Sequence, residues 1–401
     1  MNSVKLAAYS ILITGLIILT AYTTQQNRAK EIKVIPIDKY NSIYQSIDSL
    51  EIEISRKQKE NERAQGEIRR INEDIKKLNA DCEALKKSPK SDSAFATFDS
   101  VSSIKIRQNC DSLAARIKAL DSKKANKENS KAQATKILQT QEAKLAELKG
   151  KLQDELKVVS NSAKQITGSL TLKFRGVDYN IFIANSDSNE IKMHLNDKSG
   201  KNFISIGNLR NFLTGQKEDP VMITNAGMYM PNLQPQGLFV AYQELHPIDL
   251  RSPKTDANFY LMPNGVFYID TNGVSHIDTT QSFQKKYESK SLVVDYATQS
   301  GPMLVINGNI HRGFAEGSNN RKIRSGVGVI DSKKTVFAIS LDETNFYDFA
   351  VLFKDIFGCR DALYLDGAIS QMYLQDLAPD VLDGQFGPMI SVTKKKNRAN
   401  K

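Results

Sequence analysis

Hydrophobic residues in the first half of the chain recur at spacings of alternately four and three positions. The pattern runs from Ile43 to Leu85 and resumes from Ile106 to Leu152. In a helix, this spacing keeps one apolar stripe facing a partner helix along the whole length. Lys86-Lys87-Ser88-Pro89 and the polar residues after it interrupt the pattern, which is typical of a turn. The sequence therefore predicts two long helices that form a coiled-coil stalk over residues 38–166.

Polar interruptions of the apolar stripe indicate how the two helices pair. Lys57–Asn61 interrupts the apolar stripe of the first helix. If Cys82 of the first helix lies opposite Cys110 of the second, then Lys57–Asn61 lies opposite Lys131–Thr135, at the edge of the polar interruption in the second helix. We therefore expect an antiparallel hairpin, and a parallel homodimer is the competing architecture. Cys82 and Cys110 lie near the tip of the hairpin. They are expected either to form a disulfide in an oxidising compartment or to act as small buried apolar residues.

After Ser160 the pattern changes to short runs in which apolar and polar residues alternate, as in strands with one buried face. The expected strands are Leu170–Phe174, Tyr179–Ala184, Val221–Thr224, Phe259–Met262, Val266–Asp270, Met303–Ile306, Val327–Ile330, Val336–Leu341 and Ala362–Leu365. One helix is clear, with Thr344 as its N-cap and Gly358 as its end. Residues 169–392 are therefore predicted to be an α+β domain built around a mixed sheet.

The N-terminus carries an uncharged, mostly apolar run from Leu6 to Tyr22. Its length lies between that of a signal-peptide core and the roughly 20 residues of a spanning helix. Tyr22 stands where a bacterial lipoprotein would carry its lipidated cysteine. Residues 1–27 are predicted to be an uncleaved signal-anchor, with a cleaved signal peptide as the alternative. The expected location is the cell envelope, either membrane-anchored with the C-terminal domain outside the cytoplasm, or secreted or periplasmic.

The net charge of +10 is unevenly distributed along the chain. Residues 168–393 hold 20 Lys and Arg against 24 Asp and Glu, so the excess positive charge belongs to the helical half and to the tail, residues 393–401. A nucleic-acid-binding groove should itself be basic. The sequence therefore gives no support for a nucleic-acid partner. The three cysteines form no C-x-x-C, and none of the common nucleotide-binding, nucleophile-elbow or zinc-protease motifs is present.

Several polar residues directly follow the predicted strands. Asn225-Ala226-Gly227 follows one strand and Asp366-Gly367 follows another, while Arg324 opens a third at Arg324-Ser325-Gly326-Val327-Gly328. Side chains at strand ends are held rigidly, and glycine lets the backbone approach a ligand closely. A guanidinium matches two phosphate oxygens. Each motif alone is weak, because Asp-Gly is usually a turn and Arg before a strand is usually a solvated flank.

Together these motifs resemble the phosphodiester glycosidase family. The resemblance rests on four ordered blocks, Asn225-Ala226-Gly227-Met228-Tyr229, Gln299-Ser300-Gly301-Pro302, Arg324-Ser325-Gly326-Val327-Gly328 and Leu365-Asp366-Gly367-Ala368-Ile369-Ser370. It covers residues 169–392 and none of the stalk. The better-known branch of the family has glycines where this chain has Ala226 and Ala368-Ile369. The bulkier side chains are expected to narrow the pocket and change the sugar specificity.

The resemblance implies hydrolysis of a sugar–phosphate linkage at the anomeric carbon. This chemistry needs a carboxyl group at the leaving oxygen or the developing cation, and a positive charge for the phosphate. The residues expected to be catalytic are Asp366, Asp342 (or its neighbour Glu343) and Arg324, and those expected to bind substrate are Asn225, Gly227, Tyr229, Gly301, Gly367 and Ser370. No cofactor is expected, and a divalent metal beside the acidic residues stays open.

The sequence thus predicts an exported or membrane-anchored hydrolase that acts on a glycan phosphodiester of the envelope. Its expected partners are that substrate, the membrane through residues 6–22, and a protein or a second copy of the chain through the coiled coil. The alternative is a non-catalytic glycan-binding or structural envelope protein whose stalk recruits a partner.

Overall fold

The computed structural model describes residues 35–87, 98–241, 244–251, 257–367, 369–377 and 382–396. The apolar run at 6–22, Ala368 and the last residues of the basic tail, 397–401, lie outside this part of the chain. The chain divides into a hairpin unit, Ser42–Asp154, and a globular unit, which takes the described residues from 35 to 41 and from Glu155 onward. No helix within the described residues is long and apolar enough to cross a membrane.

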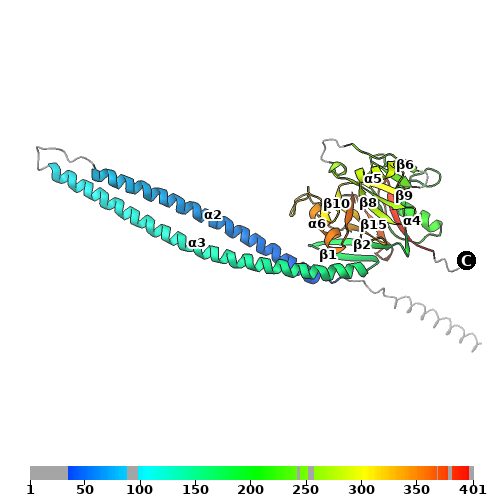
Figure 1. Cartoon of the computed structure of the whole chain (residues 1–401), viewed down its shortest axis with the longest axis horizontal. Helices are drawn as coiled ribbons and strands as arrows, with labels where there is room; N and C mark the ends of the chain where they lie inside the picture. The colour runs from blue at the N-terminus through cyan, green and yellow to red at the C-terminus, as the bar shows by residue number, and fades with distance from the viewer. Residues whose placement is uncertain are drawn as a thin grey trace, which may run out of the picture. The chain divides into compact units, whose positions relative to one another are not determined.

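Most of α2 (Asp38–Lys87) and of α3 (Phe98–Gln165) forms the hairpin unit, in which the two long helices run side by side (Figure 1). The predicted apolar stripe is buried between them, with Leu50, Ile54 and Leu138 in one cluster. Asn61 Nδ2 donates to Thr135 Oγ1 at 3.5 Å, so the polar interruptions of the two helices face each other as the sequence predicts. The helices are therefore antiparallel. Cys82 and Cys110 are half-buried thiols.

Both helices also contribute an end to the globular unit. Tyr40, at the start of α2, stacks on Phe174 with ring centroids 5.6 Å apart. Asn41 Nδ2 donates to the carbonyl of Lys173 at 2.8 Å, and Lys39 forms an ion pair with Glu155 of α3 at 2.6 Å. The start of α2 and the end of α3 are thus bonded to the globular unit and to each other.

The globular unit contains three antiparallel sheets, so the α+β class is confirmed. The first has the order β1 (Gly168–Phe174), β2 (Val177–Asn185), β13 (Lys334–Ser340), β12 (Ser325–Val329), β14 (Asp361–Asp366), β10 (Met303–Ile306) and β11 (Asn309–Ile310). The second has the order β15 (Met372–Leu374), β4 (Pro220–Asn225), β16 (Met389–Lys394) and β3 (Asn189–His194). The third has the order β6 (Glu244–His246), β5 (Phe239–Ala241), β9 (Val294–Ser300), β7 (Gly265–Asp270) and β8 (Ser275–Thr279). Every strand pair among the described residues is antiparallel, so the sheets are not mixed in strand direction.

One apolar core joins the three sheets. It takes side chains such as Val327, Leu363 and Leu365 from the first sheet, Met222 from the second and Phe267 from the third. Packing through a common core brings strand ends from all three sheets together, although they are far apart in the sequence. This arrangement positions the residues of the four sequence blocks.

Three helices of the globular unit, α4 (Ile206–Gly215), α5 (Thr280–Glu288) and α6 (Phe346–Val351), accompany the sheets. The sequence predicts α6, which continues as a π-helix over Leu352–Ile356. Its N-cap is Asn345, whose side chain accepts a hydrogen bond from Asp348 N, and not Thr344. Thr344 is buried and engaged elsewhere, because its backbone bridges Lys322 and its hydroxyl bonds to Tyr179.

The predicted strand at Phe259–Met262 is wrong. Asn258–Tyr260 is a short 3-10 helix in which Phe259 is fully buried, and the amide of Asn264 donates to the carbonyl of Phe259 at 3.2 Å. An apolar run of this length fits a buried helical turn as well as a strand, and its periodicity alone does not distinguish them.

Candidate active site

Asp366 ends β14 and is half-buried. Burial raises the pKa of its carboxyl group, and a hydrogen bond from Gly367 N–H to Oδ1, at 2.7 Å, acts in the opposite direction. The raised pKa means that this carboxyl group holds a proton more readily than an exposed aspartate. Of the predicted catalytic residues, Asp366 is therefore the one whose surroundings suit proton transfer.

Three of the sequence blocks meet beside Asp366 through Ser325. The Ser325 hydroxyl lies 2.8 Å from that of Ser370, and Asn225 Nδ2 donates to Ser325 Oγ at 3.4 Å and to Ser370 Oγ at 3.3 Å. Ser325 Oγ also accepts the backbone N–H of Asp366 at 3.2 Å. Asn225, Ser325 and Ser370 are buried. The structure thus brings the predicted residues Asn225, Asp366 and Ser370 into one hydrogen-bonded cluster.

The end of β9, in the third sheet, braces this cluster. Ser300 Oγ donates to the carbonyl of Leu365 at 2.8 Å, and Gly227 N–H donates to Thr298 Oγ1 at 3.1 Å. A Cβ at Gly227 would lie 2.3 Å from the carbonyl oxygen of Gln299, closer than packed atoms come. Glycine is therefore required where the loop after β4 passes β9. The backbone N–H of Gly227 is used in the hydrogen bond to Thr298 that holds this loop against β9.

Tyr229 belongs to the same region. Its hydroxyl donates to the carbonyl of Gln385 at 2.7 Å. Burial, and then the negative charge of Asp366, raise the pKa of Tyr229 to about 12. The phenol thus stays protonated at neutral pH and lies within the electrostatic range of the carboxylate.

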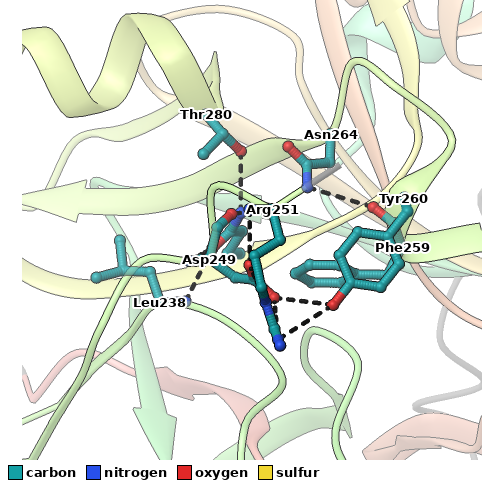
Figure 2. A network of polar contacts seen from close by, with 8 residues as sticks. Leu238, Asp249, Arg251, Phe259, Tyr260, Asn264 and Thr280 are labelled. Carbon is teal, nitrogen blue, oxygen red and sulfur yellow. Dashed lines mark hydrogen bonds and ion pairs between the residues drawn. The ribbon is translucent and has the colours of Figure 1, made fainter. Parts of the chain in front are cut away.

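Gly301 and Gln299, from the second block, have roles in packing. A Cβ at Gly301 would lie 2.6 Å from the Cβ of Asn264. The buried amide of Gln299 accepts the N–H groups of Leu238 and Asp249 and donates to Thr280 Oγ1 (Figure 2). The side-chain amide of Gln299 therefore holds β9 against the neighbouring segments at Leu238, Asp249 and Thr280.

Arg324 does not lie in an open cleft. It is 1% exposed, Nε donates to the carbonyl of Thr344, and Nη2 donates to the carbonyl of Asn320, both at 2.9 Å. The guanidinium stacks on the Phe346 ring at 3.5 Å, and burial lowers its pKa. Nη1 is buried without a hydrogen-bond partner in the described part of the chain. A phosphate contact through Arg324 stays a prediction, and it would require the buried Nη1 to become accessible.

Asp342 and Glu343 lie apart from the cluster. Both are exposed in the turn after β13, and no hydrogen bond among the described residues joins the carboxylate of Asp342 to Asp366, Ser325 or Asn225. Among the described residues, no group of three His, Cys, Asp or Glu side chains is placed to hold a metal ion. Asp366 is thus the carboxylate around which the site is organised.

The two departures from the family's glycine pattern are placed differently. Ala226 is fully buried in the core that joins the sheets, so its methyl group fills space there and does not narrow a pocket. Ile369 is 56% exposed, and its neighbour Ala368 lies outside the described residues.

Sequence reasoning missed one residue of this site, Ser325. It lies within one of the four sequence blocks, but the adjacent Arg324 has the more distinctive chemistry and was predicted in its place. The position of Ser325 at the first residue of a glycine-rich strand was the available signal.

Comparison with known proteins agrees with this geometry. The sequence model of the family described as Phosphodiester glycosidase matches residues 218–396, which include every cluster residue. The chain is also 31% identical over 214 residues to the uncharacterized protein YigE of Escherichia coli (strain K12), a match that covers 53% of this chain and 81% of that protein.

Proposed function

Because the chain belongs to the phosphodiester glycosidase family, we propose that its globular unit hydrolyses a diester in which a sugar is linked through its anomeric carbon to phosphate. The convergence of Asn225, Ser325 and Ser370 on Asp366 carries this proposal. Residues from separate blocks form one buried polar cluster beside a half-buried carboxyl group. Such an arrangement is typical of an active site.

Asp366 acts in this proposal as the proton donor. The bond between the anomeric carbon and the phosphate oxygen breaks, Asp366 protonates that oxygen, and a water molecule adds to the carbon and releases a proton to solvent. The products are the free sugar and a phosphate monoester. The raised pKa of Asp366 supports this role, because more of the carboxyl group is protonated at a given pH.

The residues around Asp366 have supporting roles. Ser325 holds the backbone of Asp366, and Gly367 N–H orients its carboxyl group. Asn225 and Ser370 fix Ser325 from the other side. Tyr229 contributes a protonated hydroxyl near the carboxylate, and Arg324 contributes positive charge through Nη1.

We also propose that the protein acts at the cell envelope, outside the cytoplasm. The support is the apolar run at Leu6–Tyr22 followed by a long helical hairpin, whose two ends are bonded to the globular unit. The hairpin would then offer its long polar surface to a protein partner.

Turnover of a panel of sugar-1-phosphodiesters tests the proposed activity. Wild-type protein should release free sugar and phosphate monoester, and Asp366→Asn should release far less. Asp295→Asn is a matched control, because Asp295 is exposed near the start of β9, away from the end of that strand at the cluster. Saturable sugar binding without turnover by the wild type would favour the non-catalytic glycan-binding alternative.

A further inference from the structure

Contact with one side chain, and not backbone conformation, requires the glycine that follows Asp366. Gly367 lacks the positive φ angle that favours glycine, so its backbone would accept an L side chain. A Cβ at Gly367 would lie 2.7 Å from the Tyr364 hydroxyl, and the next atom outside the adjacent residues is the carbonyl oxygen of Ile323, at 3.8 Å. Among the described residues, the Tyr364 hydroxyl is therefore the contact that excludes a methyl group here.

Gly367 makes two of the bonds that shape the candidate active site. Its N–H donates to Asp366 Oδ1 at 2.7 Å, and its carbonyl accepts the N–H of Ser370 at 2.8 Å. The first bond orients the carboxyl group of the proposed proton donor, and the second returns the chain to the cluster with Ser325. A displacement of Gly367 would therefore disturb both the carboxyl group and the cluster.

The Tyr364 side chain, which is 1% exposed, is held by residues outside its own strand. Its ring packs edge-on against that of Phe346 in α6, with centroids 4.9 Å apart, and the Arg324 guanidinium lies 5.6 Å from its centroid. Burial raises the pKa of Tyr364, and a hydrogen bond with the side chain of Asn258, in the 3-10 helix, acts in the opposite direction. The hydroxyl therefore occupies a fixed position against Gly367.

We propose that Tyr364 is a positioning residue: its buried hydroxyl holds Gly367, and through Gly367 the carboxyl group of Asp366, in the orientation that proton transfer requires. This inference rests on the proposed function and adds to it a side chain that acts only through Gly367. Without the hydroxyl, the turn after Asp366 gains space into which it can relax. Displacement of a catalytic group by a fraction of its own size lowers the rate strongly.

Tyr364→Phe tests the proposal, because it keeps the ring and removes only the hydroxyl. We expect kcat for a sugar-1-phosphodiester to fall about tenfold or more, while KM stays within about twofold because no substrate contact is removed. The hydrogen bond from Gly367 lowers the pKa of Asp366, so a weaker bond should raise that pKa. The kcat of a proton donor falls as pH rises through its pKa, so the falling limb of the variant's kcat profile should lie at higher pH.

Tyr268→Phe is the matched control. Tyr268 is 3% exposed, and its hydroxyl donates to Asp278 Oδ2 at 2.8 Å in the third sheet, so this change also removes a buried, hydrogen-bonded hydroxyl. Both variants should melt below the wild type, but the control should keep the wild-type kcat and pH profile. A folded Tyr364→Phe with the wild-type kcat and profile, or a control that shows the same changes, would overturn the positioning role.

A double-mutant cycle tests the contact without an assay of turnover. Gly367→Ala should lower the melting temperature of the otherwise wild-type chain, because the methyl group meets the Tyr364 hydroxyl. The same change should lower it much less in the Tyr364→Phe background, where that hydroxyl is absent. Equal losses in the two backgrounds would refute the contact.

Carbon NMR of the aspartate carboxyl groups of the full chain measures the pKa of Asp366 directly, with its signal assigned by its loss in Asp366→Asn. Tyr364→Phe should move this titration to higher pH, and an unmoved titration would overturn the positioning role. If the wild type hydrolyses no diester while the cycle and the titration give the expected results, the proposed activity is refuted and Tyr364 is still the residue that positions the Asp366 carboxyl group.

Discussion

Replacing Asp366 with asparagine keeps the size of the side chain and removes its ability to carry and transfer a proton. The Oδ1 acceptor of the hydrogen bond from Gly367 N–H, 2.7 Å long in the wild type, is retained. Loss of a general acid commonly lowers the rate by roughly a hundred- to ten-thousandfold. That range corresponds to about 2.7–5.4 kcal/mol of transition-state stabilisation.

The same substitution should not destabilise the fold. Burial raises the pKa of Asp366, so the folded state holds the proton more tightly than the unfolded state does. The contribution of this group to stability therefore falls as pH rises from the unfolded pKa through the higher folded pKa. Asparagine does not ionise, so it does not carry the free-energy cost of a buried carboxylate at neutral pH. It does replace a charge-assisted hydrogen bond by a neutral one that is weaker by about 1 kcal/mol. We expect Asp366→Asn to melt near or above the wild type at neutral pH.

The assay is hydrolysis of a sugar-1-phosphodiester by wild type, Asp366→Asn and the Asp295→Asn control, with thermal melting of all three. As a proton donor, Asp366 should give a wild-type kcat that falls as pH rises through its raised pKa. A folded Asp366→Asn with wild-type turnover would refute the catalytic assignment. A kcat that instead falls as pH decreases through the same range would refute the donor role and indicate that the carboxylate form is required.

Four further outcomes are expected. Gly227→Ala places a Cβ 2.3 Å from the Gln299 carbonyl oxygen and should lower stability by about 1–3 kcal/mol in denaturant unfolding; an unchanged midpoint would contradict the packing argument. Arg324→Lys loses the planar fork that bonds two carbonyls, so its melting temperature should fall along with its activity, and a normal melting temperature would show that these bonds are dispensable. Under oxidising conditions Cys82 and Cys110 should cross-link within one chain and give a faster monomer on non-reducing gels, whereas a covalent dimer would indicate parallel pairing. A C-terminal reporter that is active only outside the cytoplasm should give signal, and activity of a cytoplasm-only reporter would refute the proposed location.

The sequence determined the elements whose structure depends on near neighbours. The stripe from Ile43 to Leu85 predicts α2. The two polar interruptions predict which segments of the two helices lie side by side, and Asn61 bonds to Thr135 between those segments. Alternating runs predict eight of the sixteen strands in the described part of the globular unit, because burial of one face imposes a period of two. The placement of Asn225 and Asp366 at strand ends also follows from local patterns, and the resemblance to the family assigns both residues to one site.

Only the tertiary structure decided which side chains meet and which are buried. Ser325 pairs with Asp366 across β12 and β14 at an irregular position, and no local pattern reports such a register. Arg324 looks like a free cation in the sequence, yet its guanidinium is buried against Phe346, because α6 covers this face of the sheet near Gly326. Contacts between residues far apart in the chain depend on how three sheets pack around one core. Periodicity identifies the buried face of each strand but not the strand that covers it.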